Sequence, residues 1–217
     1  MGEKQYLIDA LSIGESWRIF RIMAEFVEGI DSLSELGNAV TIFGSSRVKQ
    51  DDPYYKKAEY LAHRLAEEGF SVITGGGPGI MEAGNRGAAE AGGKSVGMNI
   101  HLPFEQKPNP YANLSLDYRY FFVRKVMFIK CSMAYVVMPG GFGTLDELFE
   151  ALTLIQTKRI KGFPVILMGS EFWQGLIDWI KETMVRENKI SLNDLGIIEI
   201  IDEPEEVVRY IQKYVII

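Results

Sequence analysis

The chain has 217 residues, of which 47% are hydrophobic and 24% charged, as is typical of a globular α/β domain that can bury one large core. Its formal net charge of -6 argues against broad nonspecific binding to nucleic acid, which needs clustered lysine and arginine. The single cysteine, Cys131, excludes an internal disulfide and a cysteine-based zinc cluster, and we expect no metal site.

The N-terminal segment predicts an amphipathic helix over residues 15–30. Its apolar side chains recur at helical spacing and form a wide face. They are Trp17, Phe20, Ile22, Met23, Phe26, Val27 and Ile30. This face packs either on the helix's own domain or on a partner chain, and the sequence leaves both open.

Signals for export or membrane insertion are not found. Residues 1–16 lack a basic region followed by an apolar one. No apolar run approaches the ~20 residues that a membrane span requires. We therefore expect a cytoplasmic protein with no membrane partner and no nucleic-acid partner.

From residue 39 onward, short apolar runs alternate with segments of helical periodicity. We expect strands at 39–43, 70–74, 94–100, 116–122, 133–138, 164–168 and 196–201. Helices are expected at 53–68, 80–91, 123–131, 144–159 and 171–187, and a last helix begins at Pro204. Continuous apolar strands between helices indicate a mostly parallel sheet covered on both faces. The sequence thus predicts a Rossmann-like, doubly wound α/β fold in one domain (1–217) with an N-terminal helical extension (1–38).

Three loops rich in glycine or small polar residues follow strand ends, where such sheets bind ligands. A glycine-rich turn before a helix offers unpaired backbone N–H groups to an anion, and two loops of this kind favour a phosphate site. The candidate binding residues are Gly44, Ser45, Gly75, Gly76, Gly77, Gly79, Gly140, Gly141, Gly143 and Thr144.

The common phosphate fingerprints are incomplete. The pattern G-x-G-x-x-G/A fails from Gly75, from Gly77 and from Gly141, because its sixth position carries Ile80, Glu82 and Asp146 respectively. The P-loop tail at 93–95 precedes a strand instead of a helix. Dinucleotide binding and ATP hydrolysis therefore lose their usual sequence support.

Charged and amide side chains lie close to these loops. Glu82 and Asn85 lie one turn apart on the expected helix after the Gly75–Gly79 loop, and Glu147 follows Thr144 near the expected start of its helix. A helix N-terminus stabilises a carboxylate and lowers its pKa. Glu147 is thus either a dipole-stabilised carboxylate or a group aimed at a ligand, and local chemistry does not separate these. Arg124 and Lys125 form a basic pair at a helix start, which suggests an anionic partner or a solvated pair.

Two segments resemble motifs of the LONELY GUY family, phosphoribohydrolases that act on nucleoside 5′-monophosphates. The first is Gly75-Gly76-Gly77-Pro78-Gly79-Ile80-Met81-Glu82 with the following Asn85-Arg86-Gly87-Ala88. The second, Pro139-Gly140-Gly141-Phe142-Gly143-Thr144-Leu145-Asp146-Glu147, matches PGGxGTxxE at every fixed position. Arg124-Lys125 stands where the family carries an Arg-Lys pair, and the resemblance runs from about residue 40 to the C-terminus.

The resemblance implies hydrolysis of AMP or N6-prenylated AMP to free base and ribose 5-phosphate, without metal or organic cofactor, by a homodimer or larger homo-oligomer. It implies that Arg124 and Glu147 are catalytic. The 5′-phosphate would lie on the loop from Gly140 to Thr144, with Glu82 and Asn85 near the ribose. Two features depart from the short plant-like forms, namely the extension over 1–38 and Glu82, where those forms often have glycine, and the segment 102–111 also indicates a longer bacterial branch.

Two other functions compete with this interpretation. Relatives often carry the label lysine decarboxylase, but no lysine is marked as a pyridoxal phosphate Schiff base in a phosphate-binding context. Molybdenum-cofactor carrier proteins share the architecture and similar glycine loops, so a non-catalytic nucleotide or cofactor carrier is the alternative. The pairing of Arg124 with Glu147 favours the enzyme.

Overall fold

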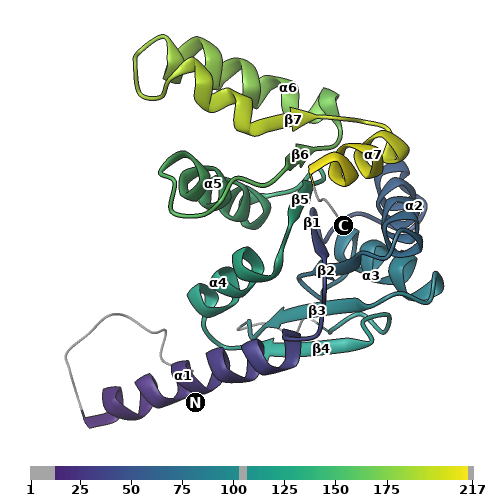
Figure 1. The fold of residues 1–217 in the computed structure, drawn as a ribbon, viewed down its shortest axis with the longest axis vertical. Coiled ribbons are helices and arrows are strands. Elements are labelled where there is room, and N and C mark those ends of the chain that lie inside the picture. The colour runs from purple at the N-terminus through teal and green to yellow at the C-terminus, as the bar shows by residue number, and fades with distance from the viewer. Residues whose placement is uncertain (1–12, 103–106, 215–217) are drawn as a thin grey trace.

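The computed structural model describes residues 13–102 and 107–214, with side chains from Trp17 onward. Within these residues the strands form a single seven-stranded sheet of order β4-β3-β2-β1-β5-β6-β7, with every pair parallel (Figure 1). The expected mostly parallel, doubly wound α/β fold is confirmed. Residues 1–12 of the expected N-terminal extension lie outside the described residues.

The elements follow the expected order along the chain. The strands are β1 (Ala39–Phe43), β2 (Ser71–Thr74), β3 (Ser95–Ile100), β4 (Leu114–Tyr118), β5 (Ala134–Val137), β6 (Val165–Leu167) and β7 (Ile198–Ile200). The α-helices are α1 (Ile13–Leu33), α2 (Pro53–Glu67), α3 (Ile80–Glu90), α4 (Phe121–Cys131), α5 (Phe142–Gln156), α6 (Ser170–Trp179) and α7 (Pro204–Tyr214). Most bounds differ from the expected ones by one or two residues.

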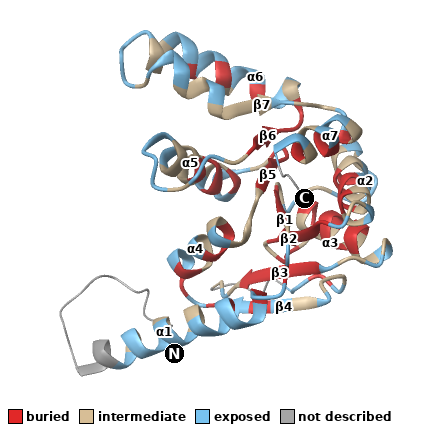
Figure 2. Ribbon diagram, viewed as in Figure 1, coloured by how far each residue is buried: buried red, intermediate tan, exposed pale blue. Residues whose placement is uncertain are grey.

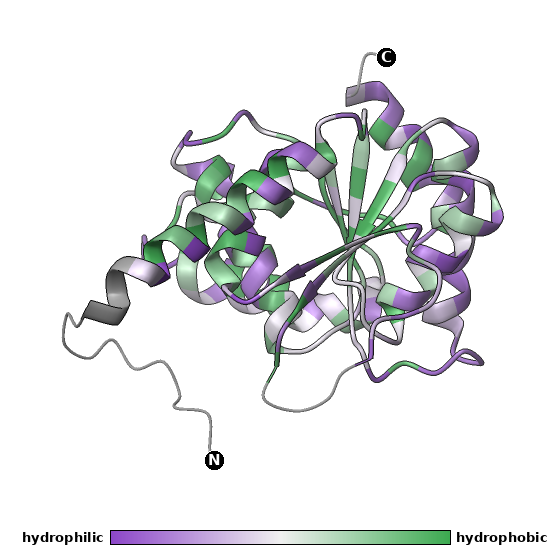
Figure 3. Ribbon diagram, turned by 90° about the horizontal axis from the view of Figure 1, so that it is seen from below, coloured by the Kyte–Doolittle hydropathy of each residue, from purple (hydrophilic) through white to green (hydrophobic). Residues whose placement is uncertain are grey.

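Two hydrophobic clusters, one on each face of the sheet, hold the layers together. Successive residues of β1 point to opposite faces, so Ala39 and Phe43 join one cluster while Val40 and Ile42 join the other. The first cluster packs the sheet against α1, α4, α5 and α6, and the second packs it against α2, α3 and α7. Figure 3 shows the hydrophobic strands between the two helical layers.

The prediction of a strand over 116–122 is wrong at its C-terminal end. The segment 116–122 was expected to be entirely extended, but β4 stops at Tyr118 and α4 begins at Phe121. Leu116, Tyr118 and Tyr120 are buried and alternate with exposed neighbours. The alternation of buried and exposed side chains therefore continues past the end of the strand. Tyr120 packs inward like a strand residue, but it is the N-cap of α4.

The region after α6 also departs from expectation. One helix was expected over 171–187, but the α-helical part ends at Trp179 and continues as a π-helical segment, Ile180–Val185. A 3-10 helix, Leu192–Ile197, then leads into β7 and was not expected. A capping box between Ser191 and Asp194 closes the start of this short helix. A capping box is a weaker sequence signal than helical periodicity, so the sequence does not predict this element.

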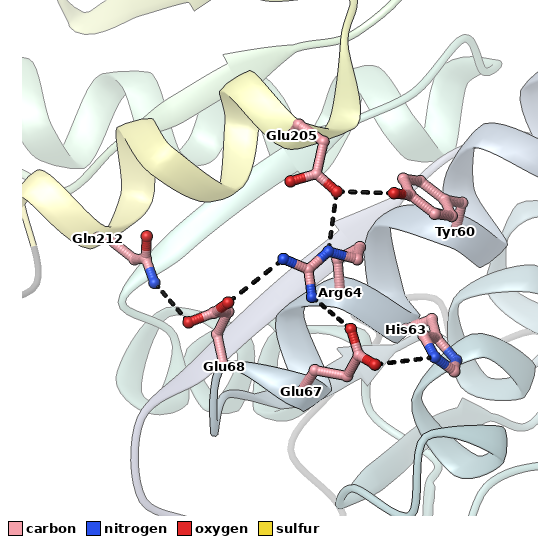
Figure 4. Close-up of polar contacts among 7 residues, drawn as sticks. All are labelled: Tyr60, His63, Arg64, Glu67, Glu68, Glu205 and Gln212. Atoms are coloured by element: carbon pink, nitrogen blue, oxygen red, sulfur yellow. Dashed lines mark hydrogen bonds and ion pairs between the residues drawn. The ribbon is translucent and has the colours of Figure 1, made fainter.

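The C-terminal helix is fixed to α2 by polar contacts (Figure 4). Arg64 on α2 donates a hydrogen bond to Glu205 of α7 at 2.8 Å and is also paired with Glu67 and Glu68 on its own helix. Tyr60 donates to the same Glu205 carboxylate at 2.7 Å. These contacts surround the apolar packing of Val207 and Ile211, so α7 closes the face of the sheet that α2 and α3 cover.

Candidate nucleotide site

The order of the sheet places its switch point between β1 and β5. From β1 the chain adds β2, β3 and β4 on one side, and β5, β6 and β7 follow on the other. The helices that follow β1 and β5 therefore leave to opposite faces, and a crevice opens at the carboxyl ends of these two strands. The loops beginning at Gly44 and Pro139 start at this crevice.

Backbone hydrogen bonds join all three predicted loops at the switch point. The N–H of Ser45 donates to the carbonyl of Pro139 at 3.0 Å, and the N–H of Ile80 donates to the carbonyl of Ser45 at 3.0 Å. The loop after β1 is thus bonded to the loop after β5 and to the first residue of α3. The structure brings together the three glycine-containing segments that the sequence singled out.

Glycine is required where these loops touch. Gly79 has a φ of 69°, and a Cβ there would lie 2.4 Å from the carbonyl oxygen of Ser45. A Cβ on Gly44 would lie 2.6 Å from the side chain of Ile80. Both glycines therefore serve close backbone approach within the protein, which is a structural role.

The loop that opens α5 divides its glycines differently. A Cβ on Gly140 would lie 2.1 Å from the Thr144 hydroxyl, so packing within the chain requires this glycine. At Gly141 and Gly143 a Cβ would meet no described atom within 4 Å. Gly141 is the N-cap of α5, and no side chain among the described residues caps it. The first N–H groups of α5 are the kind of donors that bind an anion, and the open space beside them lets one approach.

Several backbone groups of the loop after β2 are hydrogen-bonded to other groups of the protein. The N–H of Gly76 donates to the Thr74 hydroxyl at 3.0 Å, and the carbonyls of Gly76 and Gly77 accept from the backbone and side chain of Asn109. Asn109 is buried and was not singled out in the sequence, because nothing local distinguishes it from any other loop asparagine. Its contacts show that it fixes the shape of the Gly75 loop.

Asn85 is fully buried, and its side chain is hydrogen-bonded to four groups of the protein. Its carbonyl oxygen accepts from Thr74 at 2.6 Å and from Asn109 at 2.9 Å, and its amide donates to Ser95 and to the Val96 carbonyl. These contacts tie α3 to β2, β3 and the loop that carries Asn109. We therefore interpret Asn85 as a residue that holds the loop in place, and contact with a ribose stays a prediction.

Glu82 lies on α3, near the loop between β1 and α2. Its carboxylate accepts from Gln50 at 2.8 Å and from the Tyr55 hydroxyl at 3.0 Å. Burial, and secondarily the neighbouring Glu82, raises the pKa of Tyr55 to about 12. These contacts link α3 to α2 and to the loop after β1, and the expected position of Glu82 near the ribose stays a prediction.

Arg124 projects from α4 toward the Gly75 loop. One guanidinium nitrogen donates to the Met98 carbonyl at 3.4 Å, and a Cβ on Gly75 would lie 3.8 Å from the same nitrogen. The guanidinium carbon lies 5.3 Å from the Phe121 ring and 5.5 Å from the Phe128 ring. Its Nε is buried and has no hydrogen-bond partner among the described residues. A largely desolvated cation with unused donors is suited to binding an anion strongly.

Glu147 lies on α5 and is 5% exposed, and the charge of Arg124 acts on its pKa. Burial raises its pKa to about 7, although the positive charges of Arg124 and Lys125 oppose the rise. Burial likewise lowers the pKa of Arg124, and Glu147 and Asp146 oppose that change. The sequence-based expectation of a lowered Glu147 pKa is wrong. Because α5 begins at Phe142 instead of Thr144, Glu147 lies beyond the first turn, and burial outweighs the helix dipole.

Lys125, the next residue on α4, is paired with acidic side chains of α5. Its ammonium lies 2.9 Å from Asp146 and 3.1 Å from Glu150, both on α5. Burial acts to lower the pKa of Lys125, but the hydrogen bonds to Asp146 and Glu150 outweigh it and leave the pKa raised. The pair thus fixes α4 against α5, and with it the relative position of Arg124 and Glu147. Nucleotide contact by Lys125 stays a prediction.

A hollow of about 530 Å³ adjoins the switch point at the loop between β1 and α2. Its volume is in the range of small-molecule sites. It is lined by Ser45, Arg47, Val48, Lys49, Asp51, Asp52 and Pro53. Across residues 13–102 and 107–214, no group of three or more His, Cys, Asp or Glu side chains could hold a metal ion, and no helix is long and apolar enough to cross a membrane.

Known proteins resemble this chain in sequence. The family described as possible lysine decarboxylase matches residues 81–211, which is more than half of the chain. A pyrimidine/purine nucleotide 5′-monophosphate nucleosidase of Escherichia coli is 25% identical over 83% of this chain, but the match spans only 41% of the nucleosidase. A cytokinin riboside 5′-monophosphate phosphoribohydrolase of Arabidopsis thaliana is 27% identical over 83% of this chain and 84% of that enzyme.

A solved structure has the same fold. The molybdenum cofactor binding protein of Rippkaea orientalis superposes with a TM-score of 0.58, covering 81% of this chain and 94% of that protein. The two sequences are 23% identical, so this similarity concerns the fold alone.

Replacing Asn85 by alanine should destabilise the protein. The change removes one hydrogen bond from each of the buried side chains of Thr74, Asn109 and Ser95, which should lower the free energy of unfolding by about 2 kcal/mol or more. Urea unfolding measures this loss. The matched control is Asn113→Ala, which removes an exposed asparagine that also bonds to β3 and should cost less than half as much. Equal losses in both variants would contradict the structural role of Asn85.

Replacing Glu147 by glutamine should stabilise the folded protein at high pH. The folded carboxyl binds its proton more tightly than the unfolded one, so stability falls as pH rises from about 4.5 to about 7. Glutamine removes this penalty, and the gain at about pH 8 should be on the order of 2 kcal/mol and nearly absent at about pH 4. Thermal or urea unfolding across this range measures it. Glu171→Gln, an exposed glutamate in the first turn of α6, should show no such pH-dependent gain.

Proposed function

The chain belongs to the family described as possible lysine decarboxylase, the LONELY GUY family that its motifs resemble, and we propose that it hydrolyses the N-glycosidic bond of a nucleoside 5′-monophosphate. The products are the free base and ribose 5-phosphate, and AMP and N6-prenylated AMP are the first candidate substrates. Support comes from the two similar enzymes, whose names both specify nucleoside 5′-monophosphates. The label lysine decarboxylase has no counterpart in the chemistry of these residues.

The observation that carries this proposal is the pair of buried, oppositely charged side chains beside the glycine loops. Arg124 comes from α4 and Glu147 from α5, and each shifts the pKa of the other. Perturbed ionisable groups of opposite sign at the switch point of a doubly wound sheet are typical of a catalytic site. In a purely structural ion pair the Arg124 Nε would be satisfied by the carboxylate, whereas here it is buried without a hydrogen-bond partner among the described residues.

The phosphate is proposed to bind at the N-terminus of α5. The N–H groups after Gly141 and the hydroxyl of Thr144 are the donors, and the space beside Gly141 and Gly143 admits the ligand. The ribose then lies between this turn and the guanidinium of Arg124. Charge-assisted hydrogen bonds from Arg124 would hold the phosphoribosyl group or the leaving base.

Glu147 is proposed to act on the anomeric carbon. Breaking the bond between C1′ and the base nitrogen develops positive charge on the ribose ring, as in glycoside hydrolysis. An ionised Glu147 stabilises that charge and takes a proton from the attacking water, whose oxygen bonds to C1′. The base leaves with the bonding electron pair and receives a proton, so that one water is consumed for each base released. A carboxylate in a buried site does this better than one in water, because its field is less screened.

Assembly and location are further parts of the proposal. We propose that the chain acts as a homodimer or larger homo-oligomer in the cytoplasm, and the family resemblance supports this proposal. The carrier alternative predicts tight nucleotide or cofactor binding without turnover. Its support is a similarity of fold only.

Incubation of the purified protein with AMP should release adenine and ribose 5-phosphate in equal amounts, measured by chromatography. Glu147→Gln should lower turnover about a hundredfold or more, because the group that stabilises the developing charge is lost. Glu171→Gln, the same substitution at an exposed glutamate on α6, should keep wild-type turnover. Binding of AMP without release by the wild type would support the carrier, and full activity of Glu147→Gln would remove this residue from the mechanism.

The rate should rise with pH toward neutrality. Only the ionised Glu147 is active in this mechanism, and its pKa is about 7. Below that value kcat/KM should therefore fall by about tenfold for each pH unit, and above it the profile should level. Steady-state rates in buffers from about pH 5 to about pH 9 measure this. A profile that rises toward acid would instead indicate that Glu147 works as a protonated acid.

A further inference from the structure

Asn99 places an amide side chain at the carboxyl end of a buried strand. It lies on β3, which Figure 2 shows as buried over most of its length, beside the more exposed edge strand β4. Asn99 is the fifth of the six residues of β3 and is 8% exposed. The carboxyl ends of the strands are where a doubly wound sheet binds its ligand. A buried amide at this place is therefore either satisfied by the protein or presented to a ligand.

The amide nitrogen of Asn99 is hydrogen-bonded and fixes how the side chain is turned. Its Nδ2 donates to the Ser115 hydroxyl at 2.8 Å and to the Leu116 carbonyl at 3.3 Å, both on β4. A backbone carbonyl can only accept a hydrogen bond, so the nitrogen of the amide and not its oxygen must face β4. The oxygen Oδ1 consequently faces away from β4, toward the loop that follows β2.

The Asn99 oxygen lies against the glycine loop and has no donor there. A Cβ on Gly76 would lie 2.1 Å from Oδ1, so the loop and the side chain fit together only because residue 76 is glycine. The N–H of Gly76 donates to the Thr74 hydroxyl instead. Oδ1 has no hydrogen-bond partner among the residues that the structure describes. Such a nearly buried acceptor is costly unless a ligand or a water completes its hydrogen bonding.

This unused acceptor adjoins the unused donors of Arg124. The guanidinium donates at 3.4 Å to the carbonyl of Met98, the residue before Asn99 on β3. The same guanidinium nitrogen would lie 3.8 Å from a Cβ on Gly75, the residue before Gly76 in the loop. Consecutive residues of the strand and of the loop thus contact the two groups. A cation that only donates and an amide oxygen that only accepts border the same part of the crevice.

The combination of donor and acceptor selects the ligand group that fits. An ionised phosphate presents acceptor oxygens, which Oδ1 of Asn99 would repel. The exocyclic amine of a base can donate to Asn99, but its lone pair is delocalised into the ring and does not accept well from Arg124. A hydroxyl group accepts from Arg124 and donates to Asn99 at the same time. A hydroxyl of the sugar is therefore the part of a nucleotide that satisfies both side chains.

We propose that Asn99 accepts a hydrogen bond from a ribose hydroxyl, at C2′ or C3′, and thereby selects ribonucleotides over their deoxy analogues. This inference rests on the proposed function, in which the ribose lies beside Arg124. It makes the sugar a second determinant of the substrate class, besides the 5′-phosphate. A deoxy ligand is rejected because it leaves the nearly buried Oδ1 without a partner.

Steady-state kinetics with AMP, 2′-deoxy-AMP and 3′-deoxy-AMP test the contact. For the wild-type protein, kcat/KM should be about tenfold or more higher for AMP than for one of the two analogues, a comparison that needs no variant. Asn99→Ala should lower kcat/KM for AMP by a similar factor and leave it unchanged for that analogue, which already lacks the contact. A merely structural role would lower all three values alike. Asn113→Ala, an exposed asparagine that also bonds to β3, should keep the wild-type preference.

Binding separates the role of Asn99 from the hydrolase activity. Calorimetry on Glu147→Gln measures Kd for the same three nucleotides without turnover, and the preference for AMP should appear there and disappear when Asn99→Ala is added. If this preference appears but the wild type releases no base, the proposed function fails and the role of Asn99 stands.

Three results would overturn the role of Asn99 and leave the hydrolase intact. The first is turnover of AMP with no preference against either analogue, and the second is a preference that survives Asn99→Ala. The third is a loss in Asn99→Ala that is equal for all three nucleotides and absent with IMP, which lacks the exocyclic amine, because it would place Asn99 at the base. Far-UV circular dichroism checks that each variant folds.

Discussion

The candidate site depends on the backbone bonds that Ser45 makes in two directions. Its N–H is held by Pro139 after β5, and its carbonyl holds Ile80 at the start of α3. These bonds require glycine at 44 and at 79, where any side chain would collide with the neighbouring loop. Three segments that are separated by dozens of residues are thereby fixed at the one place in a doubly wound sheet where loops diverge. The positions of the α5 N-terminus and the Gly75 loop follow from this contact.

The two ionisable groups at the site, Arg124 and Glu147, are positioned by two different helices, α4 and α5. Lys125 pairs with Asp146 and Glu150 and so joins α4 to α5, and the charges of Arg124 on α4 and Glu147 on α5 act on each other's pKa. Burial works against both charges, raising the pKa of one and lowering that of the other. Burying an ionisable group lowers the stability of the fold, and such a loss is common at functional sites. A ligand with a phosphate and a developing positive charge would offset part of it.

The periphery of the fold divides into closed and open parts. At one end, α7 is sealed onto α2 by apolar packing and by the contacts around Arg64 and Glu205. At the other end, α1 packs on the sheet with only one of its two faces. The two helices differ in the side chains on their exposed faces and not in helix propensity. The exposed face of α1 carries large apolar side chains, whereas α7 exposes mainly polar ones.

The sequence by itself determined the order of elements, the parallel sheet and the three loops, because continuous apolar runs and glycine turns are local signals. It gave β1 at its observed bounds, Ala39–Phe43. Only the tertiary structure decided which groups are buried and what they contact. Glu147 illustrates this, since its helix position suggested a lowered pKa and burial by distant segments raised it. Asn109 was missed, and Gly140 could not be separated from Gly141, because the atoms that distinguish them come from elsewhere in the chain or from packing that local pattern does not encode.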